Sequence, residues 1–364
     1  MLIQNLTELY LDDVNISSAR GAHWSQAISS SLPNLKVLSL RSCNISGPIH
    51  QSFAKLQSLS VLLLDHNDIS APIPGFFANF SSLTSLSLIS CNLYGTFPKE
   101  IFQITTLQEV NLSWNPRLQG SLPEFLNNGS LQYLDLSCFN SPIDSIHWET
   151  LLIWKFSCWT PIYSMGVFHC LPFLFLYLSL SQNQFYGQLP EFANISSNLL
   201  DTLDLSGNHL EGPIPTSIFN LRGLQDLRLS SNHFSGFPFS GPQQPKNLSF
   251  LDLSNNSLLI DYNGSSPTSS SFLQIQDLFL SSNKLRAFPD FLRNQSRLAN
   301  LDLSENQIQG EIPYWIWKLN SLRFRWVRLS GGDVNLVQWG GGDFDWVMVV
   351  VQALRVVAVS SDRV

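Results

Sequence analysis

The sequence predicts a leucine-rich-repeat solenoid, a right-handed β/α superhelix. Short parallel strands are expected on its concave face, and extended and 3-10 segments on its convex face. The first observation behind this prediction is a nine-residue phrase, L-x-x-L-x-L-x-x-N, that recurs along the chain. The second is its spacing, because a period of about 20–29 residues with this pattern is typical of leucine-rich repeats. The phrase ends at Cys43, Asn67, Cys91, Asn115 and Phe139, and later at Asn183, Asn208, Asn232, Asn256, Asn283 and Asn306.

Each phrase predicts one short strand. In the phrase that ends at Asn232, Leu227 and Leu229 are two residues apart, so both point to the same side of the strand. Arg228, between them, points to the other side. One repeat cannot bury its leucines alone, so the repeats stack and bury them together. The residues beside the leucines are therefore expected to form an exposed row on the concave face.

A second recurring sequence follows the phrase and is the third observation. It starts with glycine and continues through an apolar residue to proline, as in Gly187-Gln-Leu-Pro190 and Gly212-Pro-Ile-Pro215. Glycine permits a positive φ and proline fixes φ, so this segment is extended and cannot continue as a long helix. The convex side is therefore expected to hold short extended pieces and 3-10 turns.

The last residue of each phrase is expected to satisfy backbone groups where the chain turns. An asparagine amide both donates and accepts hydrogen bonds, and stacked amides form a ladder. Cys43 and Cys91 occupy two of these positions, two repeats apart, which places their backbones about 9–10 Å from each other. That exceeds the roughly 7 Å limit for a disulfide, so both are predicted to be buried free thiols. The ladder is assigned to Cys43, Asn67, Cys91, Asn115, Asn183, Asn208, Asn232, Asn256, Asn283 and Asn306.

Composition points to a secreted protein that does not bind nucleic acid. The 364 residues carry a net charge of -7, whereas a phosphate backbone requires a basic partner. Charged residues make up only 13%, and N-x-S/T acceptors are more frequent than expected by chance, so we expect glycans to keep the chain soluble. Asn111 lies inside a predicted strand, where a glycan would be blocked. The predicted glycosylation sites are Asn5, Asn15, Asn44, Asn79, Asn111, Asn128, Asn194, Asn247, Asn255, Asn263 and Asn294.

Two interruptions of the repeat divide the chain into four parts. Residues 1–137 are predicted to be a first block of repeats without a cap, and residues 177–322 a second block. Residues 138–176 are predicted to be an irregular stretch that replaces about two repeats. Residues 323–364 are predicted to be a non-repeat tail, disordered or aberrant. The chain begins inside a repeat, without the pattern of a signal peptide.

The stretch 138–176 has three interpretations. The favoured one is a lost reading frame or retained intron, because the 44 residues from Phe139 to Asn183 nearly equal two steps of 24. An alternative is a genuine island, meaning an inserted binding loop. A membrane span is disfavoured, because Pro161 and Pro172 interrupt an apolar run that is already short for a bilayer core of about 30 Å.

The tail after Leu322 also favours an intron or out-of-frame translation. Arg325 and Val327 stand where two leucines are expected. Gln352 and Arg355 interrupt the apolar run that follows, so it does not predict a transmembrane helix. The glycine runs form neither GxxxxGK nor GxGxxG, so no phosphate-binding loop is expected.

The segment from Asp204 to Phe219, DLSGNHLEGPIPTSIF, resembles the plant-specific leucine-rich repeat. Leu9–Ser17 and Leu38–Ile49 more narrowly resemble plant receptor-like proteins of the Verticillium-wilt-resistance type. This resemblance covers roughly residues 1–137 and 175–322. It implies the extracellular ligand-recognition region of a plasma-membrane receptor in defence or developmental signalling. Such proteins have no kinase domain and signal through a partner receptor kinase. The membrane helix of the family is not found in this sequence, so a truncated member is expected.

No catalytic or metal-binding motif is found in the sequence. The seven histidines form no HExxH, and the chain contains no CxxC, GxSxG or kinase-type catalytic loop. The sequence therefore predicts a non-enzyme without cofactor or metal.

Binding is the function that remains, with a protein or peptide ligand on the concave face. Phe250 and Phe279 are predicted to be exposed in adjacent repeats and to anchor an interface. Asp226 and Arg228 suit a charged partner, whereas aspartates between the leucines have the alternative role of solvating the face. The predicted ligand-contacting residues are Asp65, His66, Glu109, Trp114, Asp204, Asp226, Arg228, Phe250, Asp252, Asp277, Phe279, Asp302 and Glu305.

Two other functions stay open at this point. One is a secreted inhibitor of a pathogen wall-degrading enzyme that resembles polygalacturonase inhibitors, although the absence of caps counts against it. The other is a truncated product without activity.

Overall fold

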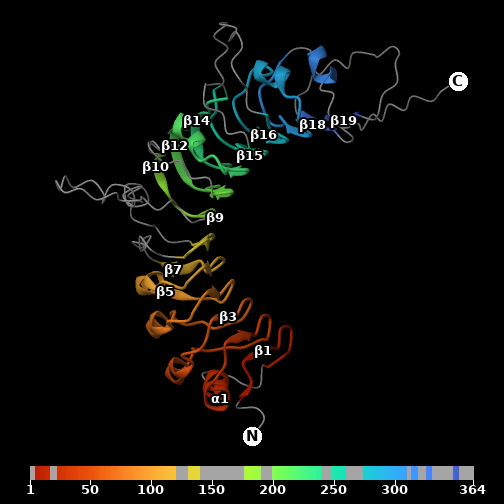
Figure 1. Ribbon diagram of the computed structural model, residues 1–364. Coiled ribbons are helices and arrows are strands. Elements are labelled where there is room, and N and C mark those ends of the chain that lie inside the picture. The colour runs from red at the N-terminus through yellow and green to blue at the C-terminus, as the bar shows by residue number, and fades with distance from the viewer. Residues whose placement is uncertain are drawn as a thin grey trace, which may run out of the picture. The chain divides into compact units, whose positions relative to one another are not determined.

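The computed structural model describes residues 5–16, 23–119, 130–139, 176–189, 199–239, 247–259, 274–309, 313–318, 325–329 and 347–351 (Figure 1). The chain divides into two compact units, Met1–Phe185 (unit 1) and Tyr186–Val364 (unit 2). Each unit is a stack of parallel strands with short helices on its other side, which is the leucine-rich-repeat solenoid that the sequence predicts.

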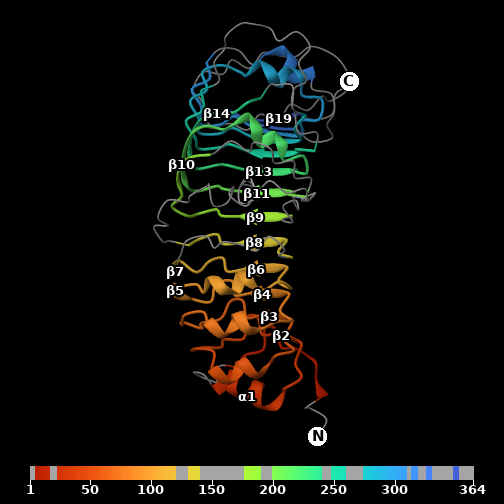
Figure 2. The ribbon, with the colours of Figure 1, turned by 60° about the vertical axis from the view of Figure 1, so that its left-hand side comes forward.

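Unit 1 has one main parallel sheet. Its strands, in the order in which they pair, are β1 (Glu8–Tyr10), β2 (Val37–Ser39), β3 (Val61–Leu63), β4 (Ser85–Ser87), β6 (Glu109–Asn111), β8 (Tyr133–Asp135) and β9 (Tyr177–Ser179). A second, small sheet pairs β5 (Tyr94–Thr96) with β7 (Arg117–Gln119). The helices are α1 (His23–Ser31), η2 (Gln51–Lys55), η3 (Gly75–Asn79) and η4 (Lys99–Gln103). Figure 2 shows the strands of this unit stacked in one column.

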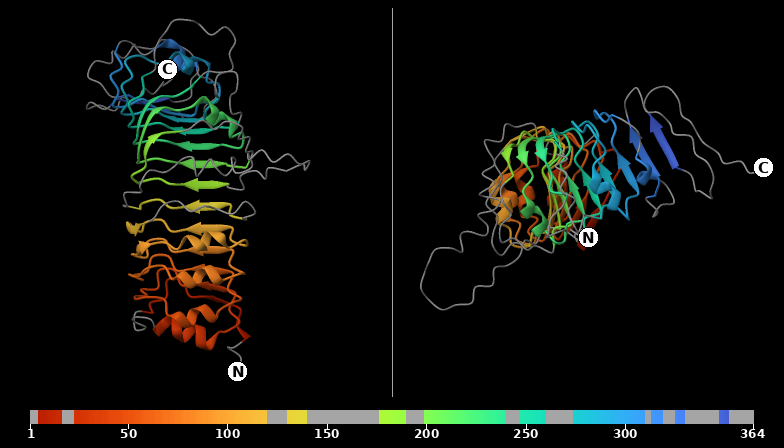
Figure 3. Two further views of the ribbon diagram at one scale, coloured as in Figure 1. Left: turned by 90° about the vertical axis from the view of Figure 1, so that its left-hand side faces the viewer. Right: turned by 90° about the horizontal axis from the view of Figure 1, so that it is seen from above.

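Unit 2 repeats the same plan. Its main sheet contains β11 (Thr202–Asp204), β13 (Asp226–Arg228), β15 (Phe250–Asp252), β16 (Asp277–Phe279), β17 (Asn300–Asp302), β18 (Arg325–Leu329) and β19 (Val347–Val351). A lateral sheet contains β10 (Tyr186–Gln188), β12 (His209–Pro213) and β14 (His233–Gly236). The 3-10 helices are η5 (Thr216–Asn220), η6 (Asp290–Asn294) and η7 (Tyr314–Lys318). The parallel direction of the strands is clear in the left panel of Figure 3.

The core of each repeat is made by the leucines of the phrase. Leu62 lies opposite Leu38 and Leu86, and all three side chains are fully buried. Phe53 and Phe77, from the 3-10 helices, are fully buried on the side of the core away from the strands. Full burial of one such side chain stabilises the fold by roughly 1.5–3 kcal/mol, so the stack, and not any single repeat, is the stable unit.

Proline sets the start of most of the convex helices. Pro74, Pro98, Pro215 and Pro289 each occupy the residue before a 3-10 helix, with φ between -63° and -72°. Their extended ψ stops the preceding segment from being helical, and the chain then has room for one short 3-10 turn before the next strand. The α-helix α1 departs from the expected convex side, because residues 16–31 lack the glycine–proline sequence that prevents a helix elsewhere.

The asparagine ladder joins each repeat to the one before it. The Nδ2 of Asn67 donates to the carbonyl oxygens of Leu40 and Leu64, both at 2.7 Å. Its Oδ1 accepts from the backbone N–H groups of Cys43 at 3.1 Å and Ile45 at 3.0 Å. Asn115, Asn232 and Asn283 donate to backbone carbonyls of their own repeat and of the one before it in the same way.

Cysteine at a ladder position keeps only part of this network. The Sγ of Cys91 donates to the carbonyl oxygen of Leu64 at 3.1 Å, and the Sγ of Cys43 donates to that of Leu11 at 2.9 Å. Both thiols are buried and free. Burial raises the pKa of the Cys91 thiol from its ordinary value of 9.0 to about 12, and it also raises the pKa of Cys43.

We therefore expect Cys43 and Cys91 to resist maleimide at about pH 8 in the folded protein and to react after unfolding in urea. The raised pKa of Cys91 also has a consequence for stability. Its contribution is fully present below pH 9.0, the unfolded pKa, and is lost as the pH rises toward about 12. Peptide mapping of labelled protein tests the first statement. Labelling of Cys91 before unfolding would contradict it.

The turn after each strand has a left-handed backbone at the residue before the ladder position. His66 has φ 57°, Trp114 has φ 59° and Glu305 has φ 54°. This conformation is uncommon outside glycine and is a genuine outlier for a bulky residue. The side chain at this position projects at the edge of the strand face, where both His66 and Trp114 are exposed.

Strands β8 and β9, on either side of the stretch predicted to replace about two repeats (residues 138–176), are neighbours in the sheet. Strand β9 pairs directly with β8, so that Tyr177 lies opposite Tyr133. The Nδ2 of Asn183 donates to the carbonyl oxygen of Leu136 at 3.0 Å, and the backbone N–H of Phe139 donates to the Oδ1 of Asn183 at 3.2 Å. These are ladder bonds between neighbouring repeats. Residues 140–175 lie outside the described residues.

Two short segments of the predicted non-repeat tail, residues 323–364, are described as strands. Strand β18 pairs with β17 so that Val327 lies opposite Leu301, and β19 pairs with β18 so that Val349 lies opposite Val327. The position equivalent to the first strand leucine is therefore Val327, two residues after Arg325, where the repeat spacing predicts it. Trp326, Val327 and Leu329 in β18 and the valine run of β19 have the β propensity that a stacked parallel strand needs. The other residues of 323–364 lie outside the described part of the chain.

Within the described residues, no helix is both long enough and apolar enough to cross a membrane.

Candidate functional site on the strand face of unit 2

Each strand offers two positions on the face turned away from the core. The first concave position precedes the first strand leucine, and the second lies between the two leucines. In unit 2 these positions line up across the sheet in register. From β11 to β17 the first positions are Thr202, Asp226, Phe250, Asp277 and Asn300, and the second positions are Asp204, Arg228, Asp252, Phe279 and Asp302.

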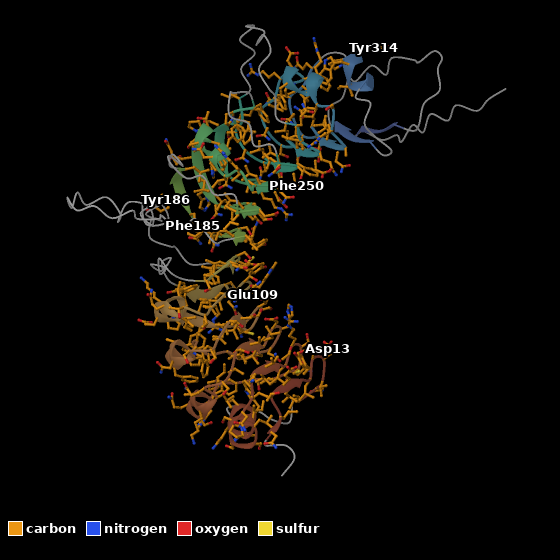
Figure 4. The ribbon with its side chains drawn as sticks, in the orientation of Figure 1. Asp13, Glu109, Phe185, Tyr186, Phe250 and Tyr314 are labelled. Carbon is orange, nitrogen blue, oxygen red and sulfur yellow. The ribbon has the colours of Figure 1, made fainter. Side chains whose placement is uncertain are left out.

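Four of these side chains form one group, which we call the Phe250 cluster: Asp226, Arg228, Phe250 and Phe279. The rings of Phe250 and Phe279 have their centroids 5.3 Å apart, with their planes at 40°. The guanidinium carbon of Arg228 lies 5.0 Å from the centroid of the Phe250 ring, a cation–π contact. Figure 4 labels Phe250, which lies on the strand side of unit 2. The sequence predicted Phe250 with Phe279, and Asp226 with Arg228, as two pairs, and the register brings the two pairs together.

Asp226 holds Arg228 in place within the cluster. The Arg228 Nη2 donates to Asp226 Oδ2 at 2.7 Å and its Nε donates to Asp226 Oδ1 at 3.1 Å, so the pair is bidentate. The Arg228 side chain is still 46% exposed, and Phe250 and Phe279 are half-buried. Two aromatic rings and a fixed guanidinium that remain open to solvent suit an interface anchor, because aromatic and arginine side chains dominate binding hot spots.

The aspartates between the leucines also have a local structural task. The Oδ1 of Asp204, Asp252 and Asp302 accepts a hydrogen bond from the backbone N–H of the serine two residues later, at 2.9 Å in each case. This bond satisfies a donor at the end of the strand. The frequency of aspartate at this position therefore has a structural cause, and ligand contact is not needed to explain it. Asp277 accepts from the Nδ2 of Asn300 across the sheet.

Asp65, in unit 1, is not placed to contact a ligand. Its side chain is buried, and its oxygens accept from Arg41 Nε at 2.9 Å, Ser87 Oγ at 2.6 Å and the Ile89 backbone N–H at 3.0 Å. The physical reason is its position directly after the last leucine of the phrase, Leu64. From there the carboxylate accepts hydrogen bonds from a serine hydroxyl and a backbone N–H of the next repeat. Arg41, whose side chain is 45% exposed, presents the charge of this pair to solvent.

The other predicted residues of unit 1 lie apart from one another. Glu109 is exposed and accepts from the Oγ of Ser85 at 3.0 Å. His66 and Trp114 are both exposed at left-handed turns, two repeats apart, and Trp114 is 64% exposed. Glu305, in unit 2, is likewise exposed at a left-handed turn. The structure does not gather these residues into one site.

Sequence reasoning missed a pair of tyrosines in unit 1. Tyr133 and Tyr177 occupy the first concave position of β8 and β9, and their rings stack with centroids 4.4 Å apart and planes at 7°. Burial, with the negative charge of Asp135 nearby, raises the pKa of Tyr133 above its ordinary range. Tyrosine at the same position of two successive phrases was the available signal. It was hidden by the assumption that repeats are missing between Phe139 and Asn183.

Histidine and metal chemistry do not define a site in the described part of the chain. There, no group of three or more His, Cys, Asp or Glu residues is placed to hold a metal ion. His209 and His233 face each other on the lateral sheet with ring centroids 5.9 Å apart, and both are exposed.

The glycan acceptors fall into two kinds where the structure describes them. Asn5, Asn15, Asn44, Asn79, Asn247 and Asn255 are exposed, whereas Asn111 is buried. The Nδ2 of Asn111, the atom that a glycan would occupy, lies 3.3 Å from Asp135 Oδ2. The side chains of Asn128, Asn194, Asn263 and Asn294 lie outside the described residues.

We expect the folded protein from a secretory host to carry glycans at the exposed acceptors and none at Asn111. A glycan on Asn111 would remove a buried donor and displace the neighbouring strand. Mass spectrometry of glycopeptides tests this expectation. Full occupancy of Asn111 in folded protein would contradict it.

Comparisons with known proteins agree with the architecture. A family model described as "Leucine rich repeat" matches residues 4–69, and a second with the same description matches residues 199–221 and 297–319. In Arabidopsis thaliana, Receptor like protein 24 is 36% identical over 162 residues, which are 43% of this chain and 18% of that protein. Receptor like protein 27, from the same plant, is 38% identical over 139 residues, 35% of this chain and 16% of the relative.

Solved structures show the same fold. The plant peptide hormone receptor RGFR1, in complex with RGF2, has a TM-score of 0.56 at 24% identity, over 91% of this chain and 51% of the receptor. A leucine-rich-repeat protein of Leptospira interrogans has a TM-score of 0.61, also at 24% identity, over 90% of this chain and 80% of the other. These structural likenesses show the fold alone.

The matched relatives are much longer than the matched segments. The chain spans 18% of Receptor like protein 24 and 14% of Receptor-like protein 53, both from Arabidopsis thaliana. Both matching family models are described as leucine-rich repeats, and these relatives are named as receptor-like proteins. In its repeats, the chain is similar to plant leucine-rich-repeat proteins of the receptor-like type.

Proposed function

We propose that the strand face of unit 2 binds an extended peptide or protein segment, with the Phe250 cluster as its anchor. The observation that carries this proposal is a cluster of side chains from β13, β15 and β16. It contains two aromatic rings in tilted contact and a half-exposed arginine that is held by a bidentate ion pair. Rigid aromatic side chains bind at low entropic cost, because little freedom is left for the ligand to remove.

The relatives support a ligand of this class. Two solved proteins with the same fold are plant receptors in complex with peptide hormones, RGFR1 with RGF2 and the HAESA ectodomain with an IDA peptide. We extend the proposal to cell-surface recognition in defence or developmental signalling, through a partner receptor kinase. The sequence resemblance and the receptor-like relatives favour that setting.

The test maps where selected peptides bind. A displayed library of random peptides is panned against the full chain, and the enriched peptides are synthesised with a photoreactive group at one end. We expect cross-links on β13, β15, β16 and β17, identified by mass spectrometry. Cross-links confined to η5 and η6 would refute the proposal. So would a failure to find any peptide whose binding saturates.

Secretory exposure is tested separately. We expect enzymatic deglycosylation of plant-expressed protein to cause a large shift in gel mobility, because the exposed acceptors are spread over both units. Substitution of the exposed asparagines by glutamine is the control and should reduce the shift. Unchanged mobility of the native sequence would contradict the extracellular assignment.

A further inference from the structure

The strand face of unit 2 carries a carboxylate on every strand from β11 to β17. These are Asp204, Asp226, Asp252, Asp277 and Asp302, and all are half-buried beside the aromatic cluster. Among the described concave positions of these strands, the only cation is Arg228, and Asp226 holds it. The face therefore has an excess of negative charge around an apolar anchor.

Three of these carboxylates have an oxygen available for a partner. The Oδ1 atoms of Asp204, Asp252 and Asp302 accept from the following serine, as described above. Their Oδ2 atoms accept no hydrogen bond within the described residues. A carboxylate with one hydrogen-bonded oxygen already has a fixed orientation, and its second oxygen can accept from a ligand. A cationic ligand group can therefore pair with it without loss of side-chain entropy from the aspartate.

The spacing of the three open carboxylates is regular. Asp204, Asp252 and Asp302 lie at the second concave position of β11, β15 and β17, and one strand separates each from the next. Because strands are about 4.8 Å apart, neighbouring carboxylates in this row are about 9.6 Å apart. A polyproline II peptide rises about 3.1 Å per residue with three residues per turn, so every third side chain lies on one face about 9.3 Å apart.

We infer that the ligand is a cationic peptide in an extended, polyproline-like conformation, with Lys or Arg side chains three residues apart and an apolar side chain between them. The cationic groups would meet Asp204, Asp252 and Asp302. The apolar side chain is turned about 120° from the cationic ones. It would therefore lie to one side of the carboxylate row, against the ring of Phe250 and the edge of Phe279 that contacts it. This inference rests on the proposed function and adds the chemistry and the spacing of the ligand.

Synthetic peptides that differ only in arrangement test the spacing. The first peptide is rich in proline and places arginines at every third residue with one phenylalanine between them. The second has the same composition with contiguous arginines, and the third replaces every arginine with glutamine. We expect the first peptide to bind the full chain about tenfold more tightly than the second, and the third to bind weakest, in fluorescence anisotropy at low salt.

The matching protein variant must avoid a new glycan acceptor. Asp252→Asn or Asp302→Asn alone would create the sequence Asn-Leu-Ser. The test chain therefore carries Asp252→Asn, Ser254→Ala, Asp302→Asn and Ser304→Ala, and the control carries only the two serine changes. The new asparagines keep an Oδ1 acceptor for the backbone N–H groups, so the turns are preserved. We expect about a fivefold to tenfold loss of affinity for the first peptide relative to the control.

The outcomes separate this inference from the function that it extends. Equal affinity for the first and third peptides, or no effect of the charge variant, would overturn the cationic ligand and leave peptide binding on this face intact. Equal affinity for the first and second peptides would overturn the spacing. An affinity for the first peptide that falls steeply with added salt supports the inference, because half-exposed charge pairs are screened.

Discussion

Replacing Asn67 by alanine is expected to lower the free energy of unfolding by about 3–4 kcal/mol. The Asn67 amide is buried, and it serves two backbone donors of the previous repeat and carbonyls of both repeats. Alanine leaves those groups buried without partners, and each such group costs about 1–3 kcal/mol. The measurement is equilibrium unfolding in urea, with far-ultraviolet circular dichroism as the signal.

Cys91→Ala is the matched control, because it changes the same position one repeat later. The Cys91 thiol is a weak donor to Leu64 and Ile89, so its loss is expected to cost only about 1 kcal/mol. A difference between the two variants isolates the amide network from simple loss of volume. Equal destabilisation by the two changes would show that the ladder bonds are not what joins the repeats.

The double change Phe250→Ala with Phe279→Ala is expected to weaken binding of a selected peptide by about 30-fold or more, equivalent to about 2 kcal/mol. Both rings are truncated in this variant, and Arg228 loses the aromatic face on which it lies. The loss should exceed that of either single change, because the two rings contact each other. Isothermal titration calorimetry with the enriched peptides measures it.

Tyr186→Ala is the control for the aromatic change. Tyr186 is 54% exposed in the same unit but lies on the lateral sheet, so its loss should leave affinity unchanged. Both variants are expected to unfold at urea concentrations close to that of the native chain, because the substituted rings are half-buried or exposed. If affinity is unchanged in the double variant, the Phe250 cluster is not the anchor.

Much of the fold follows from the spacing of leucines in the sequence. The two-residue step between Leu227 and Leu229 predicts that Arg228 lies on the opposite side of the strand, and the sheet register aligns it beside Asp252. The repeat period also implies that Phe250 and Phe279 occupy adjacent strands, although at different concave positions. The contact between the two rings depends on their size and rotamers, and the repeat period does not predict rotamers.

The remaining differences have physical causes that a one-dimensional pattern does not express. Burial of Asp65 depends on Ser87 and Arg41, which are more than twenty residues away in sequence. The Tyr133–Tyr177 stack depends on the direct pairing of β8 with β9, although the two tyrosines are 44 residues apart in the sequence. The strand β18 has valine where the repeat has leucine, and only the pairing with β17 reveals its register.

The most direct test of the central claim is an experimental structure of the full chain with a selected peptide bound. We predict that the peptide lies across β13, β15 and β16 and that one of its apolar side chains contacts Phe250 and Phe279. A peptide bound instead to the lateral sheet of β10, β12 and β14, or to the 3-10 helices, would contradict it.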